Sequence, residues 1–243
     1  MGTAVAPSDR GQGVVVRRPP LDPLRTKRED VGRGPVARYV WQHLGGYVKF
    51  PKGSGVVRFQ GNLMPTALLL IDIQMGLFMP PLEPHQGDAV VARIAMLLER
   101  ARTQRTPIFH IRHDGGERSA LAKGSPGWFH HPAVAPREDE PVIEKCHSSA
   151  FHETDLHAQL SQLGVDHLLI AGLQTEYCVD SACRTAVALG YRVTLVMDGH
   201  TTYDTPVLSA TQIIMHHNHT LDGSLVDLAT AETALLSRSS QQP

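Results

Sequence analysis

The chain has 243 residues, 42% of them hydrophobic and 19% charged, which is enough to bury the core of one substantial domain. A formal net charge of −1 argues against a nucleic-acid partner, and no apolar run approaches the roughly 20 residues that a transmembrane helix needs. The three cysteines, at positions 146, 178 and 183, cannot all pair and match no zinc-binding framework. We therefore expect reduced thiols, a cytoplasmic location and no membrane partner.

Charge divides the chain into two unequal parts. Residues 1–63 hold eleven Lys and Arg against four Asp and Glu, a net +7, whereas residues 64–243 hold twelve against twenty, a net −8. The first part is rich in Gly, Pro and Arg without a sustained apolar period, which predicts a poorly ordered basic extension. It could be a transit peptide or an arm for an acidic partner. We favour an upstream extension before a natural start at Met64, because a strand pattern begins three residues later.

Residues 64–243 alternate between strand and helix patterns and form the predicted domain. The continuous apolar run at 67–71 is typical of a strand buried on both faces, and the helix after it has an apolar stripe. In chain order, the pattern predicts a strand at Ala67–Ile71, a helix at Asp88–Arg105, a strand at Pro107–Ile111, a long loop at 113–140, a strand at Pro141–Glu144, a helix from a Thr154 cap to Gly164, a strand at His167–Ala171, a helix at Cys178–Leu189, a strand at Tyr191–Met197, a helix opening at Thr205-Pro206, a strand at Leu225–Leu228 and a C-terminal helix. Repeated β-α-β units predict a doubly wound α/β fold, with a mostly parallel sheet of about six strands and helices on both faces.

Three reactive residues follow strands of this predicted sheet. Asp72 ends the first strand, Lys145 ends the third, and Cys178 follows the fourth and opens a helix. Active sites of such folds lie at the carboxyl ends of the strands, so the three side chains should meet there. Each residue taken alone has an ordinary interpretation: the cysteine as a buried apolar side chain, the aspartate as a cap and the lysine as a solvated cation. The location of all three at the same edge of the sheet favours a catalytic site.

Each residue has a chemical role available. The helix N-terminus and Lys145 would stabilise a Cys178 thiolate. Asp72 would accept the thiol proton and later deliver it to a leaving amine. The thiolate would attack a carbonyl carbon to give a thioester, and backbone N–H groups between Gly172 and Cys178 would bind the oxyanion.

Several segments resemble the isochorismatase-like cysteine hydrolases. The resemblance covers about residues 65–235 and depends on Leu68-Leu-Leu-Ile-Asp-Ile-Gln74, Lys145-Cys-His-Ser-Ser-Ala-Phe151, Ala171-Gly-Leu-Gln-Thr-Glu-Tyr-Cys178 and Asp198-Gly-His-Thr-Thr202, with His216-His-Asn218. It implies the isochorismatase-like, three-layer Rossmann-like fold and a catalytic triad of Asp72, Lys145 and Cys178. It also implies a cis peptide bond between Leu173 and Gln174. That bond would direct the N–H of Gln174, together with that of Cys178, at the oxyanion.

The substrate pocket is expected to be lined by Phe78 from the first loop, by Trp128 and Phe129 from the long loop, and by His113 at its start. Nicotinamidases of the family bind a metal through Asp and His residues soon after the first strand. This chain has only His85 between Asp72 and His110, so we expect no catalytic metal and no other cofactor.

The cysteine favours hydrolysis of an amide or lactam C–N bond in a small molecule through a thioester. The segment ending in Cys178, with the later His-His-Asn, resembles a bacterial subgroup that includes streptothricin hydrolases. One alternative is the isochorismatase reaction, which cleaves a vinyl ether and releases pyruvate. Another alternative is a non-catalytic binding or assembly module on the same fold. Relatives in the family often form oligomers, so the resemblance also implies a homo-oligomer. The sequence does not identify the substrate.

Overall fold

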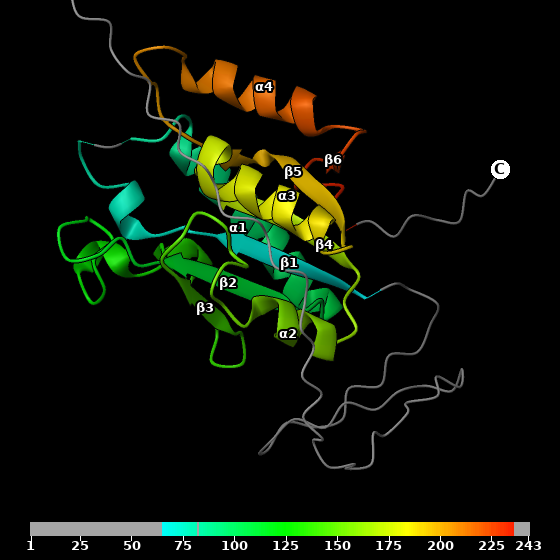
Figure 1. Ribbon diagram of the computed structural model, residues 1–243. Coiled ribbons are helices and arrows are strands. Elements are labelled where there is room, and N and C mark those ends of the chain that lie inside the picture. The colour runs from blue at the N-terminus through cyan, green and yellow to red at the C-terminus, as the bar shows by residue number, and fades with distance from the viewer. Residues whose placement is uncertain (1–64, 82, 236–243) are drawn as a thin grey trace, which may run out of the picture. The chain divides into compact units, whose positions relative to one another are not determined.

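The computed structural model describes residues 65–81 and 83–235. Six parallel strands form one sheet in the order β3-β2-β1-β4-β5-β6, so the predicted doubly wound fold is confirmed (Figure 1). The strands are β1 (Thr66–Ile71), β2 (Ile108–His113), β3 (Val142–Lys145), β4 (His167–Leu173), β5 (Arg192–Thr201) and β6 (Asp227–Ala229). The chain order reverses between β1 and β4, which places a topological switch point at the centre of the sheet.

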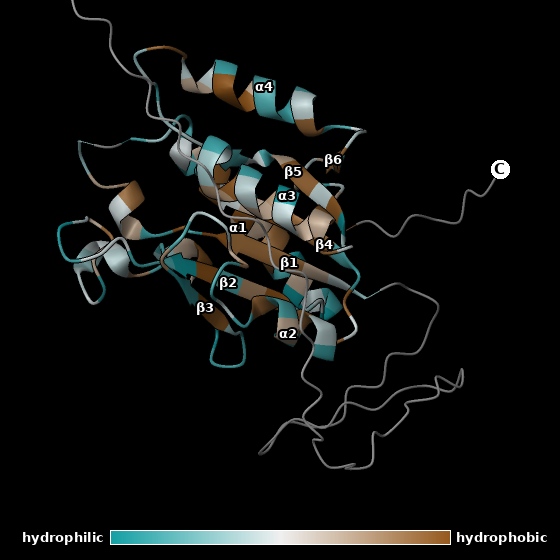
Figure 2. Cartoon of the chain, viewed as in Figure 1, coloured by the Kyte–Doolittle hydropathy of each residue, from teal (hydrophilic) through white to brown (hydrophobic). Residues whose placement is uncertain are grey.

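Strand β1 is apolar throughout because both of its faces are covered. Leu69 and Ile71 pack into a cluster with residues of three helices, whereas Leu68 and Leu70 pack on the opposite face. Alternate side chains of a strand point to opposite faces, so only a continuous apolar run can fill both layers. Figure 2 shows the corresponding hydrophobic colour along the central strands.

Helices lie on both faces of the sheet, as predicted. Helix α1 covers one face, and α2 and α3 cover the other (Figure 1). The helices are α1 (Gly87–Gln104), α2 (Leu156–Gln162), α3 (Asp180–Ala188) and α4 (Ala210–Leu221). Short 3₁₀ turns occur at η1 (Met75–Leu77), η2 (Pro126–Trp128) and η3 (Pro132–Val134), the last two within the predicted long loop.

Two predicted helix starts are wrong. Thr154 does not cap α2, because its hydroxyl donates to the carbonyl of Ala150 at 2.7 Å and the helix follows Asp155. Thr205-Pro206 lies in a loop before α4. Ser209 and Gln212 form a capping box at the true start, since each side chain accepts the other residue's backbone N–H.

The helix predicted to open at Cys178 begins two residues later. Residues Thr175–Val179 form a π-helical turn, η4, in which the N–H of Val179 donates to the carbonyl of Gln174 at 3.1 Å. Helix α3 then runs from Asp180 to Ala188. Single wide turns of this kind occur often at functional sites.

The predictions for the two ends of the chain fall largely outside the described residues. Residues 231–235 form turns, and the rest of the predicted C-terminal helix lies outside the described residues. The predictions for residues 1–63 and for a start at Met64 also lie outside them. No helix in the described part of the chain is both long and apolar enough to cross a membrane.

Gly172 allows β4 to lie against β1 at the switch point. It pairs with Ile71 and adopts a φ of 134°. A Cβ at this position would lie 2.0 Å from the carbonyl oxygen of Ile71. We expect Gly172→Ala to lower the free energy of unfolding by about 3 kcal/mol or more, because it combines overpacking with backbone strain.

Gly164→Ala is the matched control for that measurement. Gly164 also has a positive φ, 65°, but a Cβ there would have nothing within 4 Å. Its expected cost is about 1–2 kcal/mol from the left-handed backbone alone. Urea unfolding of the two variants measures the difference, and equal losses would show that the close approach of the strands does not matter.

Candidate active site

Three residues predicted from the sequence meet at the switch point. Asp72 directly follows β1, Lys145 is the last residue of β3, and Cys178 lies in η4 after β4. The carboxyl ends of parallel strands share one edge of the sheet, so residues more than 100 positions apart come into contact. Asp72 takes a left-handed φ of 48°, which turns the chain out of the strand.

The ammonium group of Lys145 is the centre of this cluster. Its Nζ lies 2.7 Å from Oδ2 of Asp72 and 3.1 Å from Sγ of Cys178, and it donates to the carbonyl of His147 at 3.1 Å. These three contacts use the three donors of an ammonium group. The side chains of Lys145 and Asp72 are 0% and 3% exposed, so the pair is buried.

The charges of the cluster determine its protonation. Burial alone would lower the pKa of Lys145, but the carboxylate of Asp72 and the neighbouring sulfur outweigh it, and the pKa is raised. Burial, reinforced by the charge of Asp72, raises the pKa of the Cys178 thiol to about 12, although Lys145 opposes the shift. The thiol is therefore protonated at neutral pH, because burial disfavours the thiolate and the charge of Asp72 adds to that effect.

Asp72 keeps one oxygen free of protein partners. Oδ2 accepts from Lys145, whereas Oδ1 is buried and has no hydrogen-bond partner among the described residues. A buried carboxylate oxygen without a donor is costly unless a proton or a ligand reaches it. Asp72 can therefore accept a proton while Lys145 continues to hold the carboxylate.

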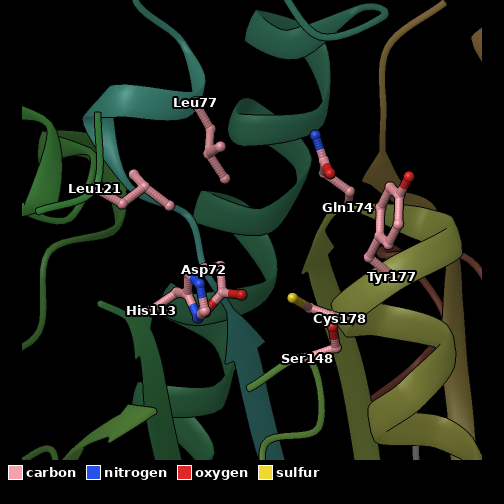
Figure 3. A pocket seen from close by; sticks show the side chains of 8 residues that line it. All are labelled: Asp72, Leu77, His113, Leu121, Ser148, Gln174, Tyr177 and Cys178. Carbon is pink, nitrogen blue, oxygen red and sulfur yellow. The ribbon is translucent and has the colours of Figure 1, made fainter. Parts of the chain in front are cut away.

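A cavity of about 220 Å³ opens onto the cluster, as the close view in Figure 3 shows. Leu77 and Leu121 form an apolar wall, and the sulfur of Cys178 lies across from Asp72. The lining residues are Asp72, Leu77, His113, Leu121, Ser148, Gln174, Tyr177 and Cys178. None of these described lining residues is Arg, and none is Lys.

Only one of the four predicted pocket residues lines this cavity. His113 does, and burial followed by the charge of Lys145 lowers its pKa, so its ring is neutral at pH 7. Phe78 instead packs against the ring of His131. The guanidinium of Arg112 lies 3.4 Å from the centre of the Trp128 ring, and Phe129 is a largely exposed neighbour of that ring. Sequence position alone does not give the direction of a loop side chain.

Five side chains of the cavity lining were not predicted from the sequence. Leu77 directly precedes Phe78, so a one-residue error in direction explains its omission, whereas Tyr177 lines the cavity together with its neighbour Cys178. Ser148 lies three residues after Lys145 in a segment that was quoted only for its family resemblance. Leu121 belongs to the long loop, and the side chain of Gln174 was not considered because only its backbone was assigned a role.

The turn before Cys178 contains a cis peptide bond between Leu173 and Gln174, at the position that the family resemblance implies. The carbonyl of Gln174 accepts from the N–H groups of Tyr177 and Val179 at 3.2 and 3.1 Å. These bonds fix the turn that carries the N–H groups of Gln174 and Cys178. Their function as oxyanion donors remains a prediction.

A buried polar chain supports the same turn from behind. The hydroxyl of Thr175 lies 2.9 Å from Nδ1 of His200, whose Nε2 lies 2.9 Å from Oδ1 of Asn218. Because the amide oxygen can only accept, Nε2 carries the proton and Nδ1 accepts from Thr175. Burial lowers the pKa of His200 to about 4, so this ring is neutral. His200 and Asn218 lie in segments that carry the family resemblance, and their contacts make them positioning residues.

Gln74 holds the long loop against the site. Its side chain is buried, donates to the carbonyls of His113 and Trp128 at 2.9 and 3.0 Å, and accepts from the N–H of His113 at 2.8 Å. One amide therefore ties the end of β2 and the middle of the long loop to the segment that follows Asp72. This explains why His113 reaches the cavity.

A metal-binding group is present, but outside the cavity. Among the described residues, His147, His152 and Glu153 are close enough together to hold an ion, and none of them lines the cavity. The absence of a catalytic metal stays a prediction.

The geometry agrees with the comparison to known families. Residues 66–214 match the sequence profile of the Isochorismatase domain, which covers more than half of the chain. The chain therefore belongs to the isochorismatase family of hydrolases.

Several curated relatives have named activities. Two streptothricin hydrolases of Streptomyces noursei are similar to this chain: one is 37% identical over 58% of this chain and 51% of its own length, and the other is 35% identical over 70% and 72%. The chain thus spans about half the length of the first. The maleamate amidohydrolase of Pseudomonas putida is 34% identical over 54% of this chain and 70% of its own length.

Solved structures share the fold. An isochorismatase from Pseudomonas putida has a TM-score of 0.67 and 32% identity, covering 70% of this chain and 90% of the other. A cysteine hydrolase from Pseudomonas syringae pv. phaseolicola has a TM-score of 0.66 and 25% identity, covering 74% and 94%.

The raised pKa of Cys178 gives a pH-dependent prediction. Between pH 7 and pH 10 the thiolate fraction of a thiol with a pKa of about 12 rises about tenfold per pH unit without levelling. We expect the alkylation rate of Cys178 by iodoacetamide, followed by peptide mass spectrometry, to rise in this way. Asp72→Asn should shift the curve to lower pH, because it removes the charge that opposes the thiolate.

Cys146 is the internal control for the alkylation experiment, because it is exposed. Its alkylation rate at each pH should be the same in the wild type and in Asp72→Asn, because Asp72 lies in the buried cluster. A Cys178 rate that stops rising near pH 9 in the wild type would contradict the electrostatic description of the cluster.

Proposed function

We propose that the protein hydrolyses an amide or lactam C–N bond of a small molecule, with Cys178 as the nucleophile. The observation that carries this proposal is the contact of Lys145 with both Asp72 and Cys178, at 2.7 and 3.1 Å, beside a cavity. An acid/base, a fixed cation and a thiol within reach of one another are the groups that acyl transfer through a thioester needs.

The reaction begins with the thiol protonated. As the substrate carbonyl binds, Oδ1 of Asp72 accepts the proton of Cys178, and Lys145 stabilises the thiolate that forms. The sulfur then bonds to the carbonyl carbon, and the carbonyl oxygen becomes an oxyanion that the N–H groups of Gln174 and Cys178 bind. Formation of the buried thiolate is unfavourable in the free enzyme. The bond to the substrate carbonyl compensates for this cost, so the proton leaves the thiol only when substrate is bound.

The second half of the reaction restores the enzyme. The C–N bond breaks, the leaving nitrogen takes the proton from Asp72, and an acyl thioester remains on Cys178. Asp72 then accepts a proton from a water molecule that attacks the thioester carbonyl, and the thiolate leaves as the acid product forms. Asp72 returns its proton to the sulfur, so the sum of the steps is amide plus water giving an acid and an amine.

The lining of the cavity favours a neutral or cationic amide. None of the described lining residues is Lys or Arg, Lys145 is already paired with Asp72, and the free carboxylate oxygen of Asp72 would repel a negative group. Isochorismate carries two carboxylates, so the vinyl-ether reaction fits this lining less well. One relative is named as an amidohydrolase that acts on maleamate, which supports amide chemistry for this chain. Maleamate carries a carboxylate, so it contrasts with the neutral amide that we propose here.

Loss of the thiol should abolish turnover. We expect Cys178→Ala to lower kcat/KM for any amide or lactam that the wild type hydrolyses by at least about 1,000-fold, because the covalent path is removed. Cys146→Ser is the matched control and should keep activity within about twofold. A panel of small amides, lactams and isochorismate, assayed by release of amine or pyruvate, measures both. Pyruvate release that persists in Cys178→Ala would sink the amide proposal.

Substrate charge gives a second, independent prediction. For two amides that differ only by a carboxylate at the end away from the scissile bond, we expect the neutral one to have a kcat/KM at least about tenfold higher. A tenfold difference in kcat/KM corresponds to about 1.4 kcal/mol of unfavourable charge interaction in the transition state. The difference should shrink in Leu121→Arg, which places a cation on the cavity wall. A preference for the anionic amide in the wild type would contradict this description of the cavity.

A further inference from the structure

The segment that follows β3 carries a compact group of metal-binding side chains. The ligand atoms of His147, His152 and Glu153 all lie within 4.8 Å of one another. Nε2 of His147 lies 3.0 Å from Oε2 of Glu153, and Nε2 of His152 lies 3.9 Å from Oε1. Each imidazole therefore faces a different oxygen of a single carboxylate.

The imidazole rings of His147 and His152 stack on each other and turn the same nitrogen, Nε2, toward Glu153. They are stacked, with centroids 4.1 Å apart and an angle of 14° between their planes. Stacked rings carry nearly parallel lone pairs, so the exposed His152 ring must turn before its Nε2 and that of His147 meet at one ion beside the shared carboxylate. A divalent transition-metal ion satisfies all three groups, and two His with one Glu is a known zinc ligand set that leaves a fourth position for water.

The distances are compatible with such an ion after small adjustments. Metal–ligand bonds of about 2.0–2.2 Å place two ligands of a tetrahedral ion roughly 3–3.5 Å apart. The pair of His147 and Glu153 already meets this separation. The side chains of His152 and Glu153 are 58% and 74% exposed, so a small rotation brings the third ligand in without disturbing the core.

The backbone that carries these ligands is anchored between them. Ala150 is fully buried, and the ring of Phe151 stacks on Tyr191 at 6.1 Å. The hydroxyl of Ser149 donates to that of Thr185 at 3.1 Å. An ion at this site would therefore order only the outer side chains, and pre-organised ligands lower the entropic cost of binding.

We propose that His147, His152 and Glu153 form a binding site for Zn²⁺ or a similar divalent transition-metal ion on this segment. The site is distinct from the active-site cavity but shares its scaffold, because the carbonyl of His147 accepts from Lys145 and Ser148 lines the cavity. The ion orders the outer side chains of the anchored segment whose His147 carbonyl accepts from Lys145. It stabilises the fold and takes no part in bond cleavage.

Isothermal titration calorimetry of the full-length, tag-free, chelator-treated protein with zinc chloride tests the proposal. We expect one tight site in the wild type and at least about tenfold weaker binding in His152→Ala and in Glu153→Gln. Nickel chloride should bind at the same site, whereas magnesium chloride should not, because imidazole ligands select against magnesium. Zinc should raise the Tm of the wild type and leave that of His152→Ala unchanged.

Two controls separate this site from other donors. His219→Ala removes an exposed histidine on α4, and Cys146→Ser removes the exposed thiol beside His147; both should keep the affinity of the wild type. The cobalt(II) complex should show visible absorption without a sulfur-to-metal charge-transfer band. Equal zinc affinity in the wild type and His152→Ala, loss of binding in Cys146→Ser, or a charge-transfer band would each overturn the proposal. Equal far-ultraviolet circular dichroism of all variants in chelator verifies that they fold.

Discussion

The buried ion pair between Lys145 and Asp72 is the interaction on which the site depends. Both charges lie out of water, 2.7 Å apart, at the ends of two different strands. Desolvation of each ion is expensive, and removal of one partner from such a pair costs about 3–5 kcal/mol because the other stays buried and uncompensated. The pair therefore requires that β3, β1 and the segment after β3 keep their relative positions. Gly172, by allowing β4 to approach β1, adds the strand that carries the thiol.

The same pair determines the state of the nucleophile. Asp72 uses one oxygen for Lys145 and leaves the other for a proton, while Lys145 uses one donor for Asp72 and another for the sulfur. The thiol of Cys178 consequently remains protonated in the resting protein, with a pKa of about 12. In the proposed reaction this protects the thiol from unproductive chemistry. The proton moves only when a bound carbonyl provides a place for the negative charge.

Polar contacts at a greater distance position the groups around the pair. Gln74 ties the long loop to the end of β1, and the chain from Thr175 through His200 to Asn218 supports the turn of the nucleophile. Gln74, Thr175 and His200 lie in a loop, in a turn and near a strand end, and Asn218 lies on α4, whereas the apolar residues of the strands supply the rigid frame. With a bound ion, His147, His152 and Glu153 add a third such support on the segment after Lys145.

The amino-acid sequence by itself determined the order of strands and helices, the parallel sheet and the convergence of Asp72, Lys145 and Cys178. Continuous apolar runs and helical stripes are local patterns, and the carboxyl-edge rule then needs only the chain order of the elements. Tertiary structure alone decided that Ser209 rather than Thr205 caps α4, and that Tyr177 rather than Trp128 lines the cavity. It also decided that the thiol is protonated, because burial and the distance to Asp72 are properties of the folded cluster. Loop side chains and pKa values depend on partners distant in sequence, and no local pattern records those partners.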